Sequence, residues 1–208
     1  MNETLSYNFS LLTSTHMLKK TYLNALKKSL HTYSEKRRDV IKISGDALHL
    51  SKRAIFSMHR GDMKEAEKKL AEAKSLLQSI AIKFKKVPEL LTEGSYHAGM
   101  EEYVEAALFH QFLKSGTLGE ELKGLDIPRD VFLAGLCDVP GELYRFAIKA
   151  ATEHKLDVVD ACNTMAQDIV ESLTEFEFTK YLRTKFDQAK QAANKLEYVV
   201  YEVSLRLK

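Results

Sequence analysis

Two short segments of the chain carry acidic side chains at helical spacing. Glu102 and Glu105 are three residues apart, and Asp138 and Glu142 are four residues apart. Residues at these spacings share one face of a helix, so each segment would present two carboxylates together. If the two faces meet, the carboxylates converge into an environment that holds Mg²⁺ or Mn²⁺ and supports phosphodiester hydrolysis. These four residues are therefore the candidate catalytic and metal-binding set.

The surroundings of Asp138 favour a site over a solvated surface. The residue follows the apolar run 131–137, where an unpaired carboxylate would be costly to bury. Its neighbours on the same helix face include the small residues Ala134, Gly135 and Gly141, which would leave room for a ligand. The chain has 29 acidic residues, and carboxylate pairs on solvated helix faces are common, so spacing alone does not decide the matter.

Length and composition favour one domain, residues 1–208. At 208 residues and 45% hydrophobic content, the chain can bury a substantial core. No apolar run reaches the roughly 18 residues of a membrane span, and no secretory signal is evident at the N-terminus. Cys137 and Cys162 lie in helical apolar patterns and suit reduced packing residues. These features predict a cytoplasmic protein.

Positive charge is concentrated in the first part of the chain. The net charge is +2, but residues 1–60 hold 11 Lys and Arg against 4 Asp and Glu. The remaining residues hold 20 basic against 25 acidic side chains. Such a basic stretch suits a polyanionic partner. A lysine-rich solvated helix face would have the same composition, so the stretch indicates nucleic acid only if an acidic metal site lies within reach.

Apolar residues recur at helical spacing almost throughout, and no sustained alternating pattern indicates strands. The sequence therefore predicts an all-α fold, a single-domain antiparallel helical bundle of about six to seven helices. We expect helices at about residues 5–59 with an interruption near Tyr33–Ser34, from 62 to before Pro88, and at about 96–114, 129–154, 157–176 and 179–207, with the main loop at 115–127.

Individual residues mark where these helices begin and end. Gly61 ends the first, and Asp62 with Glu65 forms an acidic variant of a capping box that opens the second. Gly116 closes the third. Pro128 stands where a first-turn proline is tolerated, whereas Pro140, inside the next helix, predicts a local kink or wide turn.

Three sequence blocks resemble the signatures of the translin superfamily, in the order of that family. The first is Ser44-Gly45-Asp46 followed by residues 51–60, SKRAIFSMHR. The second is residues 102–106, EYVEA, and the third is residues 138–145, DVPGELYR. The all-helical pattern fits this resemblance along the whole chain.

Within that family, translin binds nucleic acid without the full acidic set. Its partner Trax carries the acids, and together they form an RNA endonuclease. This chain has Glu102, Glu105, Asp138 and Glu142 at the positions where Trax keeps its active-site carboxylates, so it resembles Trax. Two positions depart from eukaryotic relatives, Leu50 and Pro140, and the short loop at 115–127 resembles compact archaeal members. The resemblance implies a closed homo-oligomeric shell, an octamer, that encloses RNA.

The resulting hypothesis is a metal-dependent endoribonuclease that cleaves single-stranded or short duplex RNA. Glu105 and Glu142 would bind one or two Mg²⁺ or Mn²⁺ ions directly. Asp138 would be a ligand or would orient the attacking water, and Glu102 would complete the shell. The physiological RNA stays open. A di-iron bundle is disfavoured because the chain contains no Glu-x-x-His motif.

Basic residues within the signatures are the candidate RNA contacts. Lys52, Arg53 and Arg60 would contact the RNA backbone, although each could equally form a structural salt bridge. Arg145 could neutralise a phosphate or pair with one of the acids. The alternative function is a non-catalytic, translin-type single-stranded nucleic-acid-binding protein. The four acids argue against it, because they would repel phosphate unless a cation lay between them.

Overall fold

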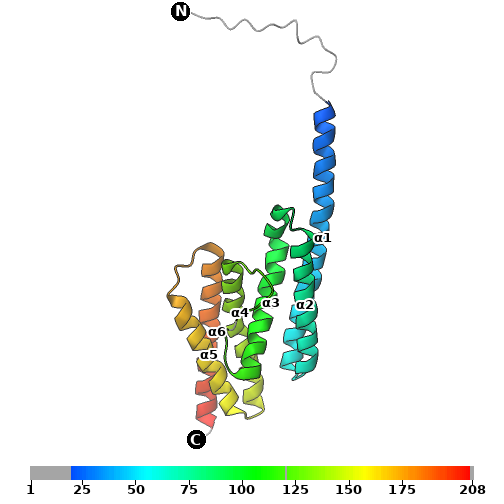
Figure 1. Cartoon of the computed structure of the whole chain (residues 1–208). Helices are drawn as coiled ribbons and strands as arrows, with labels where there is room; N and C mark the ends of the chain where they lie inside the picture. The colour runs from blue at the N-terminus through cyan, green and yellow to red at the C-terminus, as the bar shows by residue number, and fades with distance from the viewer. Residues whose placement is uncertain (1–19, 120, 207–208) are drawn as a thin grey trace, which may run out of the picture. The chain divides into compact units, whose positions relative to one another are not determined.

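A computed structural model describes residues 20–119 and 121–206, and the regular elements within these ranges are all helical (Figure 1). The all-α prediction is confirmed. The elements are α1 (Lys20–His59), α2 (Met63–Lys83), the 3₁₀ helix η2 (Pro88–Thr92), α3 (Gly94–Ser115), α4 (Arg129–Thr152), α5 (Leu156–Thr174) and α6 (Lys180–Arg206).

The chain comprises two compact units, Met1–Asp39 and Val40–Lys208. Of the first unit, the structure describes residues 20–39, which are helical. All the candidate site residues lie in the second unit. The expectation of one domain over residues 1–208 stays a prediction.

Most of the expected boundary signals act as predicted. The Asp62 side chain accepts a hydrogen bond from the backbone N–H of Glu65 and caps α2. Gly116 ends α3 with a left-handed φ of 70°, a conformation that glycine adopts without steric cost. The expected interruption at Tyr33–Ser34 is wrong: α1 continues through both residues, because their helix propensities are only slightly unfavourable. The expected helical residues 5–19 lie outside the described part of the chain. Helical backbone in α4 continues through Pro140.

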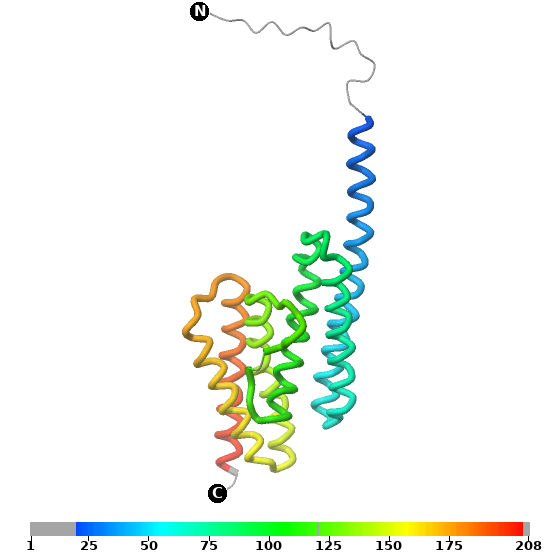
Figure 2. Tube along the Cα trace, in the orientation of Figure 1, coloured from blue at the N-terminus to red at the C-terminus, as the bar shows by residue number. Residues whose placement is uncertain are grey.

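The connections decide which helices run in the same direction. Helices α4, α5 and α6 reverse direction at short turns (Figure 2). The longer segment between α3 and α4 instead carries the chain back along the bundle, so that α4 runs parallel to α3. Aromatic contact between Phe109 and Phe146, with ring centroids 5.9 Å apart, fixes the level at which these two helices meet. The acidic segments on α3 and α4 are therefore placed side by side in the same direction.

Glycines allow the site-bearing helices to approach each other closely. A Cβ atom on Gly135 of α4 would lie 2.7 Å from the carbonyl oxygen of Glu101 and 2.7 Å from Cβ of Val104, both on α3. A Cβ on Gly99 of α3 would lie 3.1 Å from the carbonyl oxygen of Ser44 on α1. The expectation that Gly135 leaves room for a ligand is wrong, because the backbone of α3 fills that space.

Large apolar side chains fill the interior between these helices. The fully buried ones include Met58 of α1, Leu77 and Ile80 of α2, Leu108 and Phe109 of α3, Leu143 of α4, Leu173 of α5 and Leu196 of α6. Cys137 and Cys162 are buried free thiols, and burial raises the pKa of each to about 12, so both are unreactive packing residues. None of the helices in the described ranges is long and apolar enough to cross a membrane.

Candidate functional site

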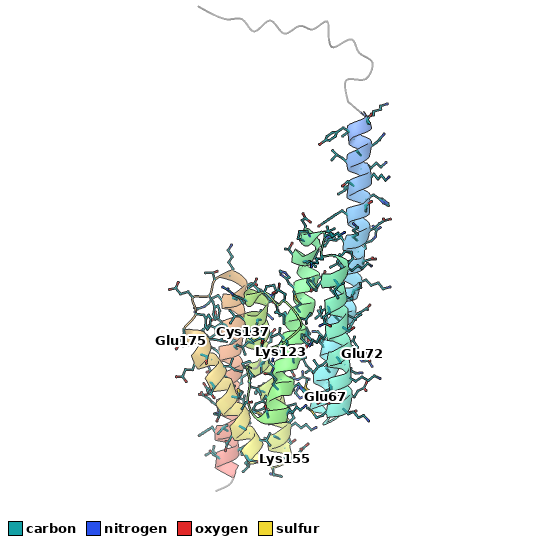
Figure 3. All side chains as sticks on the ribbon, in the orientation of Figure 1. Glu67, Glu72, Lys123, Cys137, Lys155 and Glu175 are labelled. Atoms are coloured by element: carbon teal, nitrogen blue, oxygen red, sulfur yellow. The ribbon has the colours of Figure 1, made fainter. Side chains whose placement is uncertain are left out.

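The four predicted carboxylates gather where α3 lies against α4. Glu102 and Glu105 come from α3, and Asp138 and Glu142 come from α4, where Cys137, labelled in Figure 3, directly precedes Asp138. Burial raises the pKa of Glu105 well above its ordinary value, and the negative charges of Asp138, Glu102 and Glu142 raise it further. The close approach of Gly135 of α4 to Glu101 and Val104 of α3 places the two acid-bearing segments side by side. The repulsion that Glu105 experiences indicates that the four predicted acids share this region.

Lysine 52 of α1 neutralises the first of these acids. Its Nζ lies 3.3 Å from Oε2 of Glu102, whose side chain is mostly buried. Burial nevertheless raises the pKa of Glu102, because desolvation outweighs the attraction of Lys52. Of the two roles predicted for Lys52, the structure therefore shows the salt bridge.

A lysine on α6 joins α4 to α3. Nζ of Lys185 donates a hydrogen bond to Oδ2 of Asp138 at 2.5 Å and lies 2.8 Å from Oε1 of Glu101. One helical turn earlier, the hydroxyl of Tyr181 donates to the same oxygen of Glu101 at 2.7 Å. Burial opposes the charge on Lys185, but its bonds to Asp138 and Glu101 outweigh burial and raise its pKa. Burial also raises the pKa of Asp138 despite this ion pair.

Glu142 has two basic partners. One of its carboxylate oxygens contacts Nε2 of His59, and Arg145 donates to both oxygens at 2.9 and 3.0 Å. Burial alone would raise the pKa of Glu142, but the bonds to His59 and Arg145 outweigh it and lower the pKa. The His59 ring is itself held against Phe109, with centroids 5.2 Å apart. Arg145 therefore takes the acid-pairing role, one of the two expected for it.

Glu105 differs from the other three acids. Among the described residues, neither a hydrogen bond nor an ion pair engages its carboxylate. It is mostly buried, at the level of α3 where the other acids converge. A carboxylate that is desolvated, repelled by three neighbours and without a direct cationic partner is a site where a bound cation would relieve the greatest strain.

Two of the predicted RNA-contact residues lie at the C-terminal end of α1, away from the carboxylates. Arg53 and Arg60 are exposed, and together with Phe56, Glu65 and Lys69 they line a hollow of about 250 Å³. The Arg60 guanidinium donates to the Ser57 hydroxyl at 3.4 Å. No carboxylate of the candidate site lies in this hollow.

Sequence reasoning missed four residues of the site: His59, Glu101, Tyr181 and Lys185. The first two had a signal, because His59 lies within the first signature block and Glu101 immediately precedes the second. Tyr181 and Lys185 had none. They lie far along the chain from the acids and reach them only because α6 packs on α4.

The donor set suits a hard divalent cation, because carboxylate oxygens are the ligands that Mg²⁺ and Mn²⁺ prefer. In this structure the four carboxylates do not form a metal-ligand shell. Within the described ranges, no group of three or more His, Cys, Asp and Glu side chains is placed to hold a metal ion. The physical reason is that three of the four acids are directed toward basic side chains. Metal binding would require those acids to exchange a cationic partner for the ion.

Residues 35–207 match the translin family. The chain belongs to the translin family. Among its relatives is translin-associated protein X of Rattus norvegicus, 24% identical over 227 residues, an alignment that covers 88% of this chain and 77% of the relative. An uncharacterized protein of Methanocaldococcus jannaschii is 28% identical over 161 residues, covering 75% of this chain and 69% of that protein. Within the translin family, the chain is thus similar to Trax and to archaeal members.

Two solved structures have the same helical fold. The crystal structure of apo-NeC3PO superposes with a TM-score of 0.79 at 25% identity, covering 90% of this chain and 99% of that one. The structure of AfC3PO in complex with duplex RNA superposes with a TM-score of 0.76 at 24% identity, covering 89% and 97%. The helical-bundle prediction and the resemblance to the translin superfamily are both confirmed.

Proposed function

We propose that this translin-family chain is a metal-dependent endoribonuclease whose active site consists of Glu102, Glu105, Asp138 and Glu142. One observation carries the proposal: the structure gathers four mostly buried carboxylates from two helices and leaves one of them, Glu105, without a direct cationic partner. Such an arrangement costs stability in the absence of a cation, so it is typical of a site that binds one.

In the proposed active site the side chains have different roles. A divalent cation held by these carboxylates would activate a water and offset the charge that develops on the phosphate. Arg145, half-exposed beside Glu142, would bind a phosphate oxygen. Lys185 holds Asp138 in place from α6, and His59 holds Glu142 from α1. The protein thereby fixes the acids on rigid helices before RNA arrives.

RNA is the favoured polymer for two reasons. AfC3PO, which shares this fold, has a known structure in complex with duplex RNA. In addition, Arg53 on α1 and Arg60 directly after it present exposed positive charge near Lys52 and His59, which α1 contributes to the carboxylate site. Basic side chains beside a carboxylate centre would hold the phosphate backbone near the acids.

The second candidate function is nucleic-acid binding without cleavage. It is favoured by the ion pairs of the site, because Lys52, Lys185 and Arg145 already neutralise three of the four acids. In that case the carboxylates would serve to join helices α1, α3, α4 and α6. Both functions would use the same basic surface to bind nucleic acid, and they differ only in catalysis.

A cleavage assay separates them. The protein is incubated with end-labelled single-stranded RNA and with short duplex RNA, with Mg²⁺, with Mn²⁺ or with EDTA. We expect cleavage that requires the metal and is lost in Glu105→Gln, which keeps the shape of the side chain. Glu171→Gln, at an exposed position on α5, is the matched control and should cleave normally. Equal cleavage by the Glu105→Gln protein would overturn the proposal, and binding without cleavage by the wild type would establish the alternative.

We also propose that the chain acts as a homo-oligomeric shell, most simply an octamer. Several large apolar side chains on α6 and α4 are exposed, among them Tyr198, Tyr201 and Ile148. Exposed apolar groups of this size suit an interface between subunits. Native mass spectrometry should show a multiple of the 23.7 kDa subunit mass, and a monomer alone at micromolar concentration would contradict the shell.

A further inference from the structure

Phe56 of α1 has an unusual position for a phenylalanine. Half of its surface, 50%, is exposed, so the ring does not belong to the core. On the same helix, Lys52 and His59 lie on the side that contacts the carboxylates, through Glu102 and Glu142. The ring is therefore placed at the border of the candidate active site.

Arginine 145 connects the ring to that site. Its guanidinium carbon lies 5.6 Å from the centre of the Phe56 ring, and the same guanidinium donates to Glu142. A planar group stacked on this ring would therefore lie close to Arg145, which contacts the proposed catalytic carboxylate of Glu142.

Phe56 also contributes to a positively charged hollow. Among the described residues, the hollow of about 250 Å³ that the ring helps to form is lined by Arg53, Arg60, Lys69 and one acid, Glu65. Lys69 already pairs with Glu65 one helical turn away, so the two arginines supply the net charge of the hollow. An aromatic ring near exposed guanidinium groups offers the two contacts that a nucleotide needs, a surface for its base and positive charge for its phosphate.

We propose that Phe56 is a stacking platform for one nucleobase of the bound RNA, and that Arg53 and Arg60 bind a phosphate next to it. Aromatic stacking accepts any base, because every base has a π face. A guanidinium group can donate two parallel hydrogen bonds to the oxygens of one phosphate. The platform would set where the RNA backbone passes Arg145 and the carboxylates. This inference rests on the proposed function, since it assigns a base and a phosphate to the same substrate.

Binding of an RNA oligonucleotide in EDTA tests the platform without cleavage. Phe56→Ala should weaken binding roughly 5- to 150-fold, the range of one lost base stack, whereas Phe56→Trp should retain binding. Phe176→Ala removes a phenylalanine of equal exposure, 51%, on the segment between α5 and α6, and should leave the affinity unchanged. Unchanged binding by the Phe56→Ala protein would overturn the proposal.

An abasic scan identifies the stack itself. Each RNA in the series lacks one base, at a different position. At one position, loss of the base should weaken binding to the wild type as much as Phe56→Ala weakens binding of the intact RNA. The Phe56→Ala protein should bind that abasic RNA and the intact RNA with equal affinity. If the abasic series has no such position, or if Phe56→Ala changes the native mass of the assembly, the ring packs between subunits and the platform is wrong. RNA binding without cleavage would defeat the nuclease proposal and leave the platform standing.

Discussion

The ammonium of Lys185 on α6 lies 2.5 Å from Oδ2 of Asp138 on α4. The same nitrogen lies 2.8 Å from Oε1 of Glu101 on α3. One cation thus joins two acids of different helices at the edge of the carboxylate cluster. Helix α6, which contributes no carboxylate to the site, determines where Asp138 points.

Lys185→Met should destabilise the protein. The variant leaves two mostly buried carboxylates without their cation, and we expect a loss of about 1–3 kcal/mol, below the value for a fully buried pair because the groups keep some solvent contact. Lys190→Met is the matched control, since Lys190 pairs with the half-exposed Asp187 on the same helix. Thermal unfolding should show a much larger decrease for Lys185→Met, and Asp138→Asn should restore part of it. Equal losses for the two lysine variants would contradict this role.

Gly135→Ala should separate the two acidic helices. The added Cβ would lie 2.7 Å from the backbone of Glu101 and from Val104, and neither can move away without shifting α3. Overpacking of this kind costs roughly 1–3 kcal/mol or more. Gly141→Ala on the same helix meets nothing within 4 Å, and should stabilise by up to about 1 kcal/mol through helix propensity. Opposite changes in Tm for these two variants would confirm the close approach, and equal changes would refute it.

Glu105→Gln and Glu142→Gln should have opposite effects on the stability of the metal-free protein. The folded-state pKa of Glu105 lies above the ordinary value of 4.5, so ionisation of this side chain destabilises the folded protein above that pH. A glutamine at the same position does not ionise and avoids this loss of stability. The folded-state pKa of Glu142 lies below 4.5, so its ionised form contributes stability above that pH, which is lost as the pH falls through the lowered pKa.

The measurement is Tm against pH in EDTA. At pH 7–8, Glu105→Gln should unfold about 2–4 °C above the wild type and Glu142→Gln below it, if each effect is worth about 1 kcal/mol. Below about pH 4 the advantage of Glu105→Gln should vanish, because the glutamate is then protonated in both states. A Glu105→Gln protein that is less stable than the wild type at pH 8 would show that Glu105 is satisfied by a partner.

Affinity for RNA should fall steeply with salt. Each phosphate contact with single-stranded RNA contributes about 0.7 to the log–log slope, so Arg53→Gln should reduce the slope by roughly that amount and weaken binding to all sequences alike. Lys85→Gln, an exposed lysine just beyond α2, is the control and should leave the slope unchanged. Fluorescence anisotropy at several salt concentrations measures both, and an unchanged slope for Arg53→Gln would place the hollow away from the RNA.

The sequence by itself determined the all-α class, most helix ends and the acid pairs. Helical periodicity and capping are local properties, so Asp62 and Gly116 could be assigned from their neighbours in the chain. The spacing of Glu102 with Glu105, and of Asp138 with Glu142, requires only that each segment be helical.

Tertiary structure alone decided how these faces meet and what neutralises them. The parallel course of α3 and α4 depends on the path of the long connection, and the close approach at Gly135 depends on two helices packing together. The pairing of Lys185 with Asp138 and of His59 with Glu142 joins residues far apart in the chain. No periodicity encodes such contacts, because they arise from packing of whole helices and not from local backbone preference.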